Sequence, residues 1–176
     1  MNFHSKGLVT IQVTTHRTSS RDEARDAVRQ SLVQALSSAM PGSSPVLVTV
    51  PGRRPSLASP LVDIGLSISH EEGLSLGAIN LLGPVGVDLM CPLDGPDLMD
   101  VARTYLGPLA ASALHKQGTQ FRAPQFARFW TRHEARMKCC GLPLVEWHPA
   151  LAHQLDQCRD ESLAMPPGYV AHLAWA

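Results

Sequence analysis

The N-terminal part of the chain combines the pattern of a strand with that of a helix. Apolar and polar residues alternate over 7–13, as they do in a strand with one buried face. Apolar residues then recur at every fourth position, which predicts an amphipathic helix over 21–39. Ser20 and Glu23 have the spacing of a capping box at the start of this helix, and a Pro-Gly pair ends it.

The middle of the chain consists of short segments rich in β-branched and other apolar residues. A strand is predicted over 46–50, and three more follow closely over 62–69, 74–82 and 85–90. The last three are separated by short glycine-containing turns. Such turns leave no room for a helical crossover, so we expect these three strands to form an antiparallel meander.

The C-terminal half changes to the helical pattern. Residues 95–117 predict helix with a break at Gly107. Residues 124–140 predict a stronger helix that has a proline in its first turn and stops at Gly141. Weak strand patterns follow at 145–147 and 169–175. This order of strands and helices predicts an α+β fold.

Composition narrows the class of protein. The 176 residues suit one globular unit or two small lobes sharing a core. Lys+Arg and Asp+Glu both number 15, and this balance argues against a nucleic-acid binder, which would carry a basic excess. No apolar run of bilayer length and no signal peptide are evident, and the four cysteines form no CxxC pair. We therefore expect a soluble, cytoplasmic protein with reduced thiols and no affinity for membranes.

A strand carboxylate and a helical Glu-Lys pair are the main candidates for chemistry. Asp88 interrupts the otherwise apolar strand 85–90, where a carboxylate is costly to bury unless it is paired, hydrogen-bonded or bound to a metal. Glu134 and Lys138 lie four residues apart, so they share one face of the predicted helix. The simplest interpretations are a solvated aspartate at a strand end and a surface ion pair worth about 0.3–0.5 kcal/mol.

Motifs for several other chemistries are missing from the sequence. His133 and Glu134 would begin a zinc-protease motif only if residue 137 were histidine, and it is Met137. Ser69 and His70 lack the glycines of a nucleophile elbow. With no Walker loop and no GxGxxG, a phosphate ligand would be held by basic side chains and backbone. The basic candidates, each of which could also be a solvated residue, are Arg25, Arg53 and Arg54.

Four elements in this order resemble the 4′-phosphopantetheinyl transferase family, and most closely its surfactin-synthetase-activating branch. They are G-R-R-P (52–55), L-S-I-S-H (66–70), G-V-D-L-M (86–90) and F-W-T-R-H-E-A-R-M-K (129–138). The resemblance covers residues 20–141 and the last ten residues. It implies transfer of 4′-phosphopantetheine from coenzyme A to a serine of an apo acyl or peptidyl carrier protein, with Mg²⁺ required and 3′,5′-ADP released.

The resemblance also implies a role for each candidate residue. Asp88 and Glu134 would bind Mg²⁺, and Lys138 would contact the coenzyme A phosphates. Glu134, or a water on the metal, would help deprotonate the acceptor serine. The remaining coenzyme A contacts would come from Ser69 and His70 at the phosphates of the nucleotide end, and from Arg25 and Arg54 at the 3′-phosphate.

For the fold, the resemblance implies two similar α/β lobes in one compact monomer, with the active site between them. We place the lobes at 1–84 and 85–176. The segment 85–90 would lie on one side of the cleft and the helix 124–140 on the other.

The sequence departs from the family pattern at three positions. His133 replaces a lysine, Ser67 replaces an asparagine, and Met90 stands where many members place a second metal-binding acid. Methionine is a poor ligand for the hard Mg²⁺ ion. Two alternatives therefore stay open: an impaired homologue that binds coenzyme A or a carrier protein without transfer, and an α+β scaffold whose motif matches are accidental.

Overall fold

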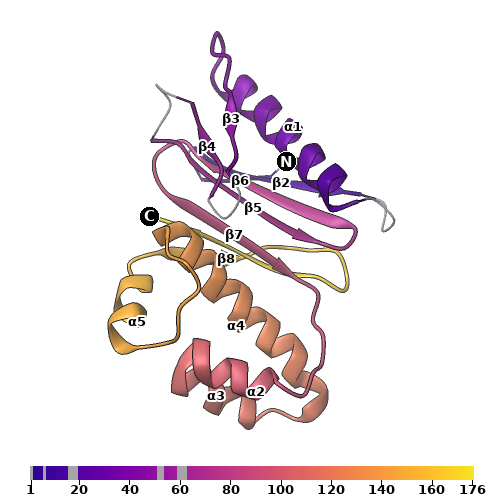
Figure 1. Ribbon diagram of the computed structural model, residues 1–176, viewed down its shortest axis with the longest axis vertical. Coiled ribbons are helices and arrows are strands. Elements are labelled where there is room, and N and C mark those ends of the chain that lie inside the picture. Colours follow the sequence, from indigo (N-terminus) through magenta and orange to yellow (C-terminus); the bar gives the residue numbers. More distant parts are fainter. Residues whose placement is uncertain (1, 6, 16–19, 51–53, 59–62) are drawn as a thin grey trace.

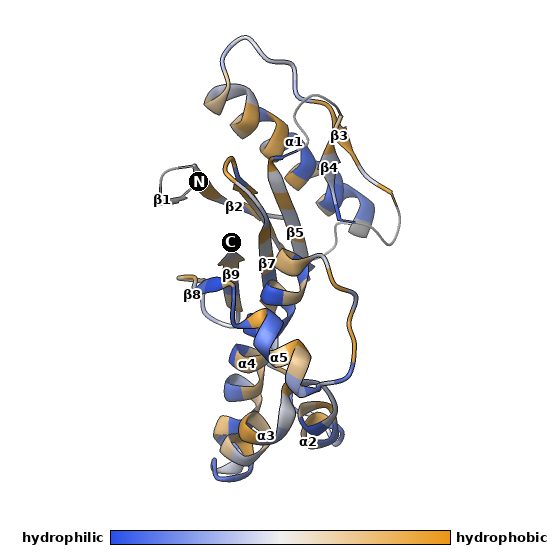
Figure 2. Ribbon diagram, turned by 90° about the vertical axis from the view of Figure 1, so that its left-hand side faces the viewer, coloured by the Kyte–Doolittle hydropathy of each residue, from blue (hydrophilic) through white to orange (hydrophobic). Residues whose placement is uncertain are grey.

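The chain folds into layers of helix and sheet. The computed structural model describes residues 2–5, 7–15, 20–50, 54–58 and 63–176. Helix α1 (Arg21–Ala39) lies at one end, the strands lie in the middle, and the remaining helices lie at the other end (Figure 1). Figure 2, turned by 90°, shows the same order. The observed mixture of helices and sheets is compatible with the predicted α+β fold.

A first sheet carries α1 on one face. Its strands lie in the order β1-β2-β6-β5, and every neighbouring pair is antiparallel. The strands are β1 (Asn2–Ser5), β2 (Leu8–Thr14), β5 (Gly65–Glu71) and β6 (Leu74–Asn80). The predicted capping box is confirmed, because the Glu23 amide donates to Ser20 Oγ at 3.2 Å and the Ser20 amide donates to Glu23 Oε2 at 2.7 Å.

A second sheet packs between the first sheet and helix α4 (Thr119–Cys140). Its strands lie in the order β7-β9-β8 and are β7 (Val85–Met90), β8 (Arg159–Ser162) and β9 (Val170–Trp175). Alternate residues of β7 face opposite ways, as in any strand. Val87 and Leu89 join the apolar core shared by the two sheets, whereas Gly86 lies against α4. A Cβ at Gly86 would lie 1.9 Å from the carbonyl oxygen of Ala135, so glycine permits the close approach of helix and strand.

The predicted meander is right for β5 and β6 and wrong for β7. Strand β6 already pairs with β2 on its other edge, so β7 pairs with β9 instead. Strand β7 nevertheless lies beside β5 (Figures 1 and 2). There Val87 N donates to Ser67 Oγ at 3.0 Å and Leu89 N donates to Ser69 Oγ at 3.2 Å. Where the two sheets meet, serine hydroxyls of β5 thus accept the hydrogen bonds of β7 amides that backbone carbonyls would accept within a single sheet.

The helical prediction over 95–117 is confirmed together with its break. It comprises α2 (Leu98–Val101), a π-helical segment (Ala102–Leu106) and α3 (Gly107–His115). Gly107 has φ +82°, and a Cβ there would lie 2.6 Å from the indole of Trp147. Both the turn and the packing therefore require glycine.

Other boundaries differ from the sequence prediction. Helix α4 starts at Thr119 and not at Pro124, so the proline lies inside the helix, while Gly141 ends it with φ +68° as expected. The strand predicted over 145–147 is wrong, since this segment is a loop in which Trp147 N donates to Thr104 O at 2.8 Å.

Several short elements complete the fold. Helix α5 (Pro149–Leu155) and strand β8 were not predicted, whereas β9 confirms the strand expected over 169–175. The strand predicted over 46–50 is reduced to β3 (Leu47–Val48), which pairs with β4 (Ser56–Leu57). Within the described residues, no helix is both long enough and apolar enough to cross a bilayer.

Candidate functional site

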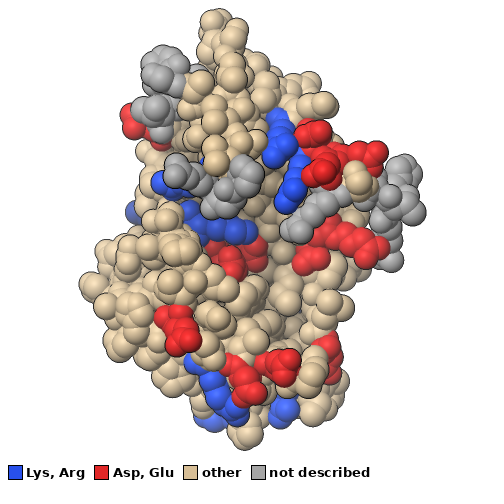
Figure 3. Space-filling model, viewed as in Figure 1, with Lys and Arg blue, Asp and Glu red and all other residues tan. Residues whose placement is uncertain are grey.

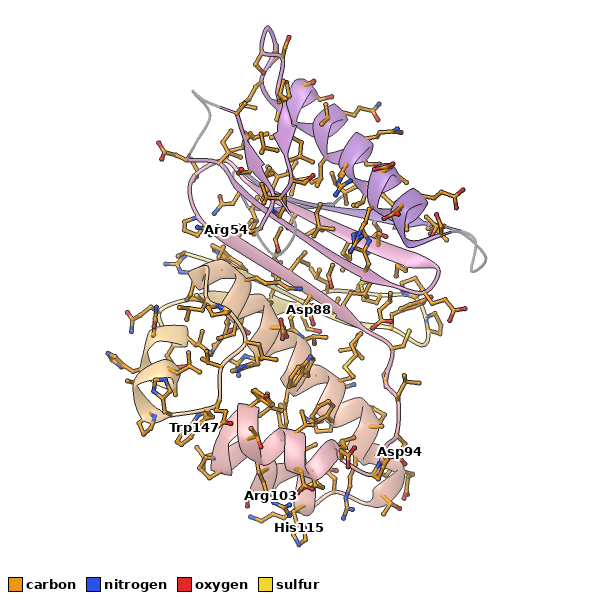
Figure 4. All side chains as sticks on the ribbon, in the orientation of Figure 1. Arg54, Asp88, Asp94, Arg103, His115 and Trp147 are labelled. Carbon is orange, nitrogen blue, oxygen red and sulfur yellow. The ribbon has the colours of Figure 1, made fainter. Side chains whose placement is uncertain are left out.

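Asp88 is the centre of a buried polar cluster between β7 and α4. Asp88 is only 7% exposed, so it is not a solvated aspartate at the end of a strand. Lys138 Nζ donates to Asp88 Oδ1 at 2.6 Å and to the carbonyl of Val87 at 3.2 Å. Ser69 Oγ donates to the same Asp88 oxygen at 2.9 Å. Because Gly86 allows α4 to approach β7 closely, the ammonium group of Lys138 on the helix reaches the strand carboxylate. Figure 4 shows Asp88 at this junction of β7 and α4.

Glu134 lies one turn before Lys138 on the same helix and is half-buried. Burial raises the pKa of its carboxyl, the nearby charge of Asp88 raises it further, and Lys138 lowers it. The simpler interpretation as a surface ion pair between Glu134 and Lys138 does not describe this lysine, because Lys138 pairs across the helix-strand interface with Asp88. The site thus contains two carboxylates close enough to repel each other, with one ammonium group between helix and strand.

The donor chemistry at Asp88 and Glu134 fits a hard divalent cation that is shared with a ligand. Mg²⁺ is usually bound through one or two carboxylates and keeps several waters or ligand phosphate oxygens. A cation would also relieve the repulsion that raises the pKa of Glu134. No group of three or more His, Cys, Asp or Glu residues is arranged to hold a metal in the described part of the chain. Met90 contributes nothing to such a site, since it packs against the apolar cluster formed by the α2–α4 region.

A basic pocket of about 660 Å³ opens beside this cluster. Its lining includes Arg54, Ser56, Ser67, Ile68, Lys138 and Gly141. The Arg54 guanidinium rests over Gly141, where a Cβ would lie 3.3 Å from its Cζ. Figure 3 shows basic atoms next to acidic atoms at the centre of this face, and Figure 4 places Arg54 above the C-terminal end of α4. A pocket with two cationic side chains beside a pair of carboxylates suits a phosphate-bearing ligand that brings a metal ion with it.

The structure brings only some of the predicted ligand-binding residues to this pocket. Ser69 is 7% exposed and bonds to Asp88 and to the Leu89 amide, so its observed contacts are with the carboxylate. The His70 Nδ1 atom lies 2.8 Å from Ser75 Oγ within the β5-β6 hairpin. Arg25 donates to Asp22 at 3.2 Å on α1. The pocket lining includes none of Ser69, His70 and Arg25, and Arg53 is outside the described residues.

Glu71 is a further acidic residue near the site that the sequence did not single out. It ends β5 and is half-buried. Burial raises the pKa of its carboxyl, the backbone amide of Cys91 lowers it, and the charge of Asp88 adds to the increase. Its position continues the β5 series Ser67, Ser69, Glu71, whose side chains face β7. The signal for this residue was the period-two spacing, which the predicted strand end at 69 cut short.

Comparisons with known proteins support one class. No protein-family model matches the chain. The chain is nevertheless similar, over half of its length, to a 4′-phosphopantetheinyl transferase. The relative concerned is the 4′-phosphopantetheinyl transferase HetI of Nostoc sp. (strain PCC 7120 / SAG 25.82 / UTEX 2576), which is 29% identical over 90 residues. The match covers 50% of this chain and 38% of the relative's length.

Proposed function

We propose that this protein transfers 4′-phosphopantetheine from coenzyme A to a serine of an apo acyl or peptidyl carrier protein. The observation that carries the proposal is the position of Asp88, Glu134 and Lys138 beside a basic pocket that also contains Arg54. Coenzyme A offers a pyrophosphate and a 3′-phosphate, and both need cationic partners. The similarity to HetI supports the same class of reaction.

The reaction joins the serine oxygen to the phosphorus that carries the pantetheine arm and breaks the bond from that phosphorus to the leaving 3′,5′-ADP. A magnesium ion held by Asp88 and Glu134 would supply neutralisation of the pyrophosphate charge. Lys138 adds a fixed positive charge at the wall of the pocket. Following the family resemblance, Glu134 would also help to accept the serine proton.

The finer parts of the proposal follow the family resemblance. Ser69 and His70 would meet the phosphates of the nucleotide end, and Arg25 and Arg54 would meet the 3′-phosphate. For Arg54, the proposal is supported by its place in the pocket lining. For Ser69, we propose orientation of Asp88 in addition, which its 2.9 Å hydrogen bond supports.

We also propose the surfactin-synthetase-activating subtype, a monomer and a cytoplasmic location. The chain would form two similar lobes, 1–84 and 85–176, with the site between them. The first sheet uses strands up to Asn80 and the second uses strands from Val85 onward, which supports this division. Asp88 would then come from the second lobe and its Ser69 partner from the first.

Mass spectrometry of intact carrier proteins tests the proposed function. Several apo acyl and peptidyl carrier proteins are incubated with the protein, coenzyme A and Mg²⁺, with an EDTA control. We expect a mass gain of one phosphopantetheinyl group on at least one carrier, and we expect EDTA to abolish it. No gain on any carrier would overturn the assignment of transfer.

One observation favours a second candidate, a homologue that binds coenzyme A without transferring its arm. Met90 packs into an apolar cluster, so the position of the family's second acid contributes no metal ligand. Calorimetry with coenzyme A separates the two candidates. Binding without any mass gain on the carriers would favour the second candidate, whereas neither binding nor transfer would favour an accidental motif match.

A further inference from the structure

Two thiols lie in contact at the C-terminal end of the helix that carries Glu134 and Lys138. Cys140 is the last residue of α4, and Cys158 lies between α5 and β8. Their sulfur atoms are 3.4 Å apart. All four cysteines lie within the described part of the chain, and none is in a disulfide. A disulfide bond is about 2.05 Å long, so each sulfur needs to move by less than 1 Å or so to form one.

The surroundings favour Cys140 as the thiol that reacts first. Cys140 is half-buried, whereas Cys158 is 6% and Cys139 is 2% exposed. Cys139 packs with Ala135, Ala174 and Cys158 beneath the helix and also interacts with the Cys158 thiol, but its burial means that a reagent in solvent reaches it poorly. A bridge between the adjacent residues Cys139 and Cys140 would be strained. Both Cys139 and Cys140 therefore lie next to Cys158, and accessibility favours Cys140 as the thiol that a reagent in solvent reaches first.

We propose that Cys140 and Cys158 form a thiol-disulfide exchange site that reacts with low-molecular-weight disulfides. The Cys140 thiolate attacks one sulfur of the disulfide, forms a mixed disulfide and releases one small thiol. Cys158 then loses its proton and attacks the Cys140 sulfur, which forms the protein disulfide and releases the second small thiol. The protein is oxidised by two electrons and the small disulfide is reduced by two. This site is independent of the proposed transferase function.

The cross-link would close a loop around α5. The enclosed segment, residues 141–157, contains α5 together with Gly141, Leu142 and Pro143, which belong to the wall of the basic pocket. Closing a loop of this length restricts the unfolded chain, and the expected increase in melting temperature is about 5–10 °C. The same bond fixes the end of α4 to the segment that leads into β8.

Glutathione disulfide is the probe for the test. Burial and the hydrogen bond to Cys158 raise the pKa of the Cys140 thiol to about 11, so the reaction is run near pH 9 to supply thiolate. The test uses a Cys91→Ser background, which removes the cysteine that is distant in sequence from Cys139, Cys140 and Cys158. In that background we expect a loss of two hydrogen atoms in the intact mass. Peptide mapping should find Cys140 joined to Cys158.

Three variants distinguish this site from general thiol oxidation. Cys158→Ser should stop at one glutathionyl group on Cys140, Cys140→Ser should form no internal disulfide, and Cys139→Ser should still form the cross-link. Recovery of a Cys139–Cys158 bridge, or a parent protein that retains glutathione on Cys140, would overturn the proposal. So would an oxidised protein whose melting temperature is unchanged or lower.

Discussion

At the scale of single residues, the site depends on side chains that share their partners. Asp88 receives hydrogen bonds from Ser69 and Lys138, and its charge raises the pKa of Glu134. A buried ion pair costs desolvation that its attraction only partly offsets, so it is weak evidence for stability alone. The Asp88–Lys138 pair lies beside the basic pocket, so a role in ligand binding explains it better than a role in stability. Removing either partner should therefore affect function and stability together.

Ser69 offers a residue-scale prediction for stability. Ser69→Ala removes the acceptor of the Leu89 amide and a donor to Asp88. Leaving a buried amide unsatisfied costs about 1–3 kcal/mol, which should lower the free energy of unfolding by that amount in urea denaturation. Ser38→Ala is the matched control, because the exposed Ser38 hydroxyl donates to Gln34 O within α1 and holds no buried group. Equal stability of the two variants would contradict the role assigned to Ser69.

His133 predicts how stability depends on pH. It is 9% exposed, and its Nε2 atom has no hydrogen-bond partner among the described residues. Burial and the charge of Arg136 lower its pKa. The folded protein therefore binds fewer protons at this residue than the unfolded chain. Above the pKa of about 6.5 that His133 has in the unfolded chain, this residue is neutral in both states and does not oppose folding. As pH falls below that value, the unfolded chain takes up a proton more readily than the folded protein, so the free energy of unfolding declines.

Urea denaturation between about pH 7.5 and 5.5 tests this consequence. The free energy of unfolding should fall with decreasing pH less steeply in His133→Phe than in the parent. His153→Phe changes an exposed histidine and should keep the parent's slope. Parallel curves for the parent and His133→Phe would show that His133 titrates alike in both states.

At the scale of elements, the approach of α4 to β7 positions the site. Gly86 allows the helix backbone to lie against the strand, so Lys138 reaches the strand carboxylate and Glu134 lies near enough to feel its charge. Gly86→Ala would place a Cβ 1.9 Å from Ala135 O, and backbone must move to relieve the clash. We expect a loss of stability above about 3 kcal/mol, visible in the melting temperature or as failure to fold.

Gly95→Ala provides the control for this substitution. A Cβ at Gly95 would meet nothing within 4 Å, so its melting temperature should stay within a few degrees of the parent's. If Gly86→Ala were equally well tolerated, the described contact between α4 and β7 would be wrong.

The elements also show what sequence patterns can and cannot predict. Helix α1 was predicted with its cap because both signals are local. Asp88 stood out because a carboxylate in an apolar strand needs a partner, but the partners that the structure shows, Ser69 and Lys138, were not predicted. The contact between β5 and β7 depends on which strand edges are already occupied, a non-local fact. Glu71 was missed because the predicted strand ended two residues too early, and α5 has too few residues for a clear helical period.

At the scale of the whole molecule, two sheets meet along β5 and β7, and the candidate site lies where they meet α4. The first sheet supplies Ser69, the second supplies Asp88, and the C-terminal helix supplies Glu134 and Lys138. The basic pocket draws on both halves of the chain through Arg54 and Lys138. Such a site forms only when both halves are folded together, so its activity should be lost in the same transition as the fold.

The most direct test compares the parent with Asp88→Asn in the carrier-protein assay. The substitution keeps the shape of the side chain and removes the charge that pairs with Lys138 and acts on Glu134. We expect intact mass spectrometry to show a phosphopantetheinyl gain with the parent and a rate at least about 100-fold lower with Asp88→Asn. Asp97→Asn, an exposed carboxylate before α2, should keep the parent's rate. Transfer by Asp88→Asn at the parent's rate would contradict the proposed function, because the cluster around Asp88 would not be the site of the reaction.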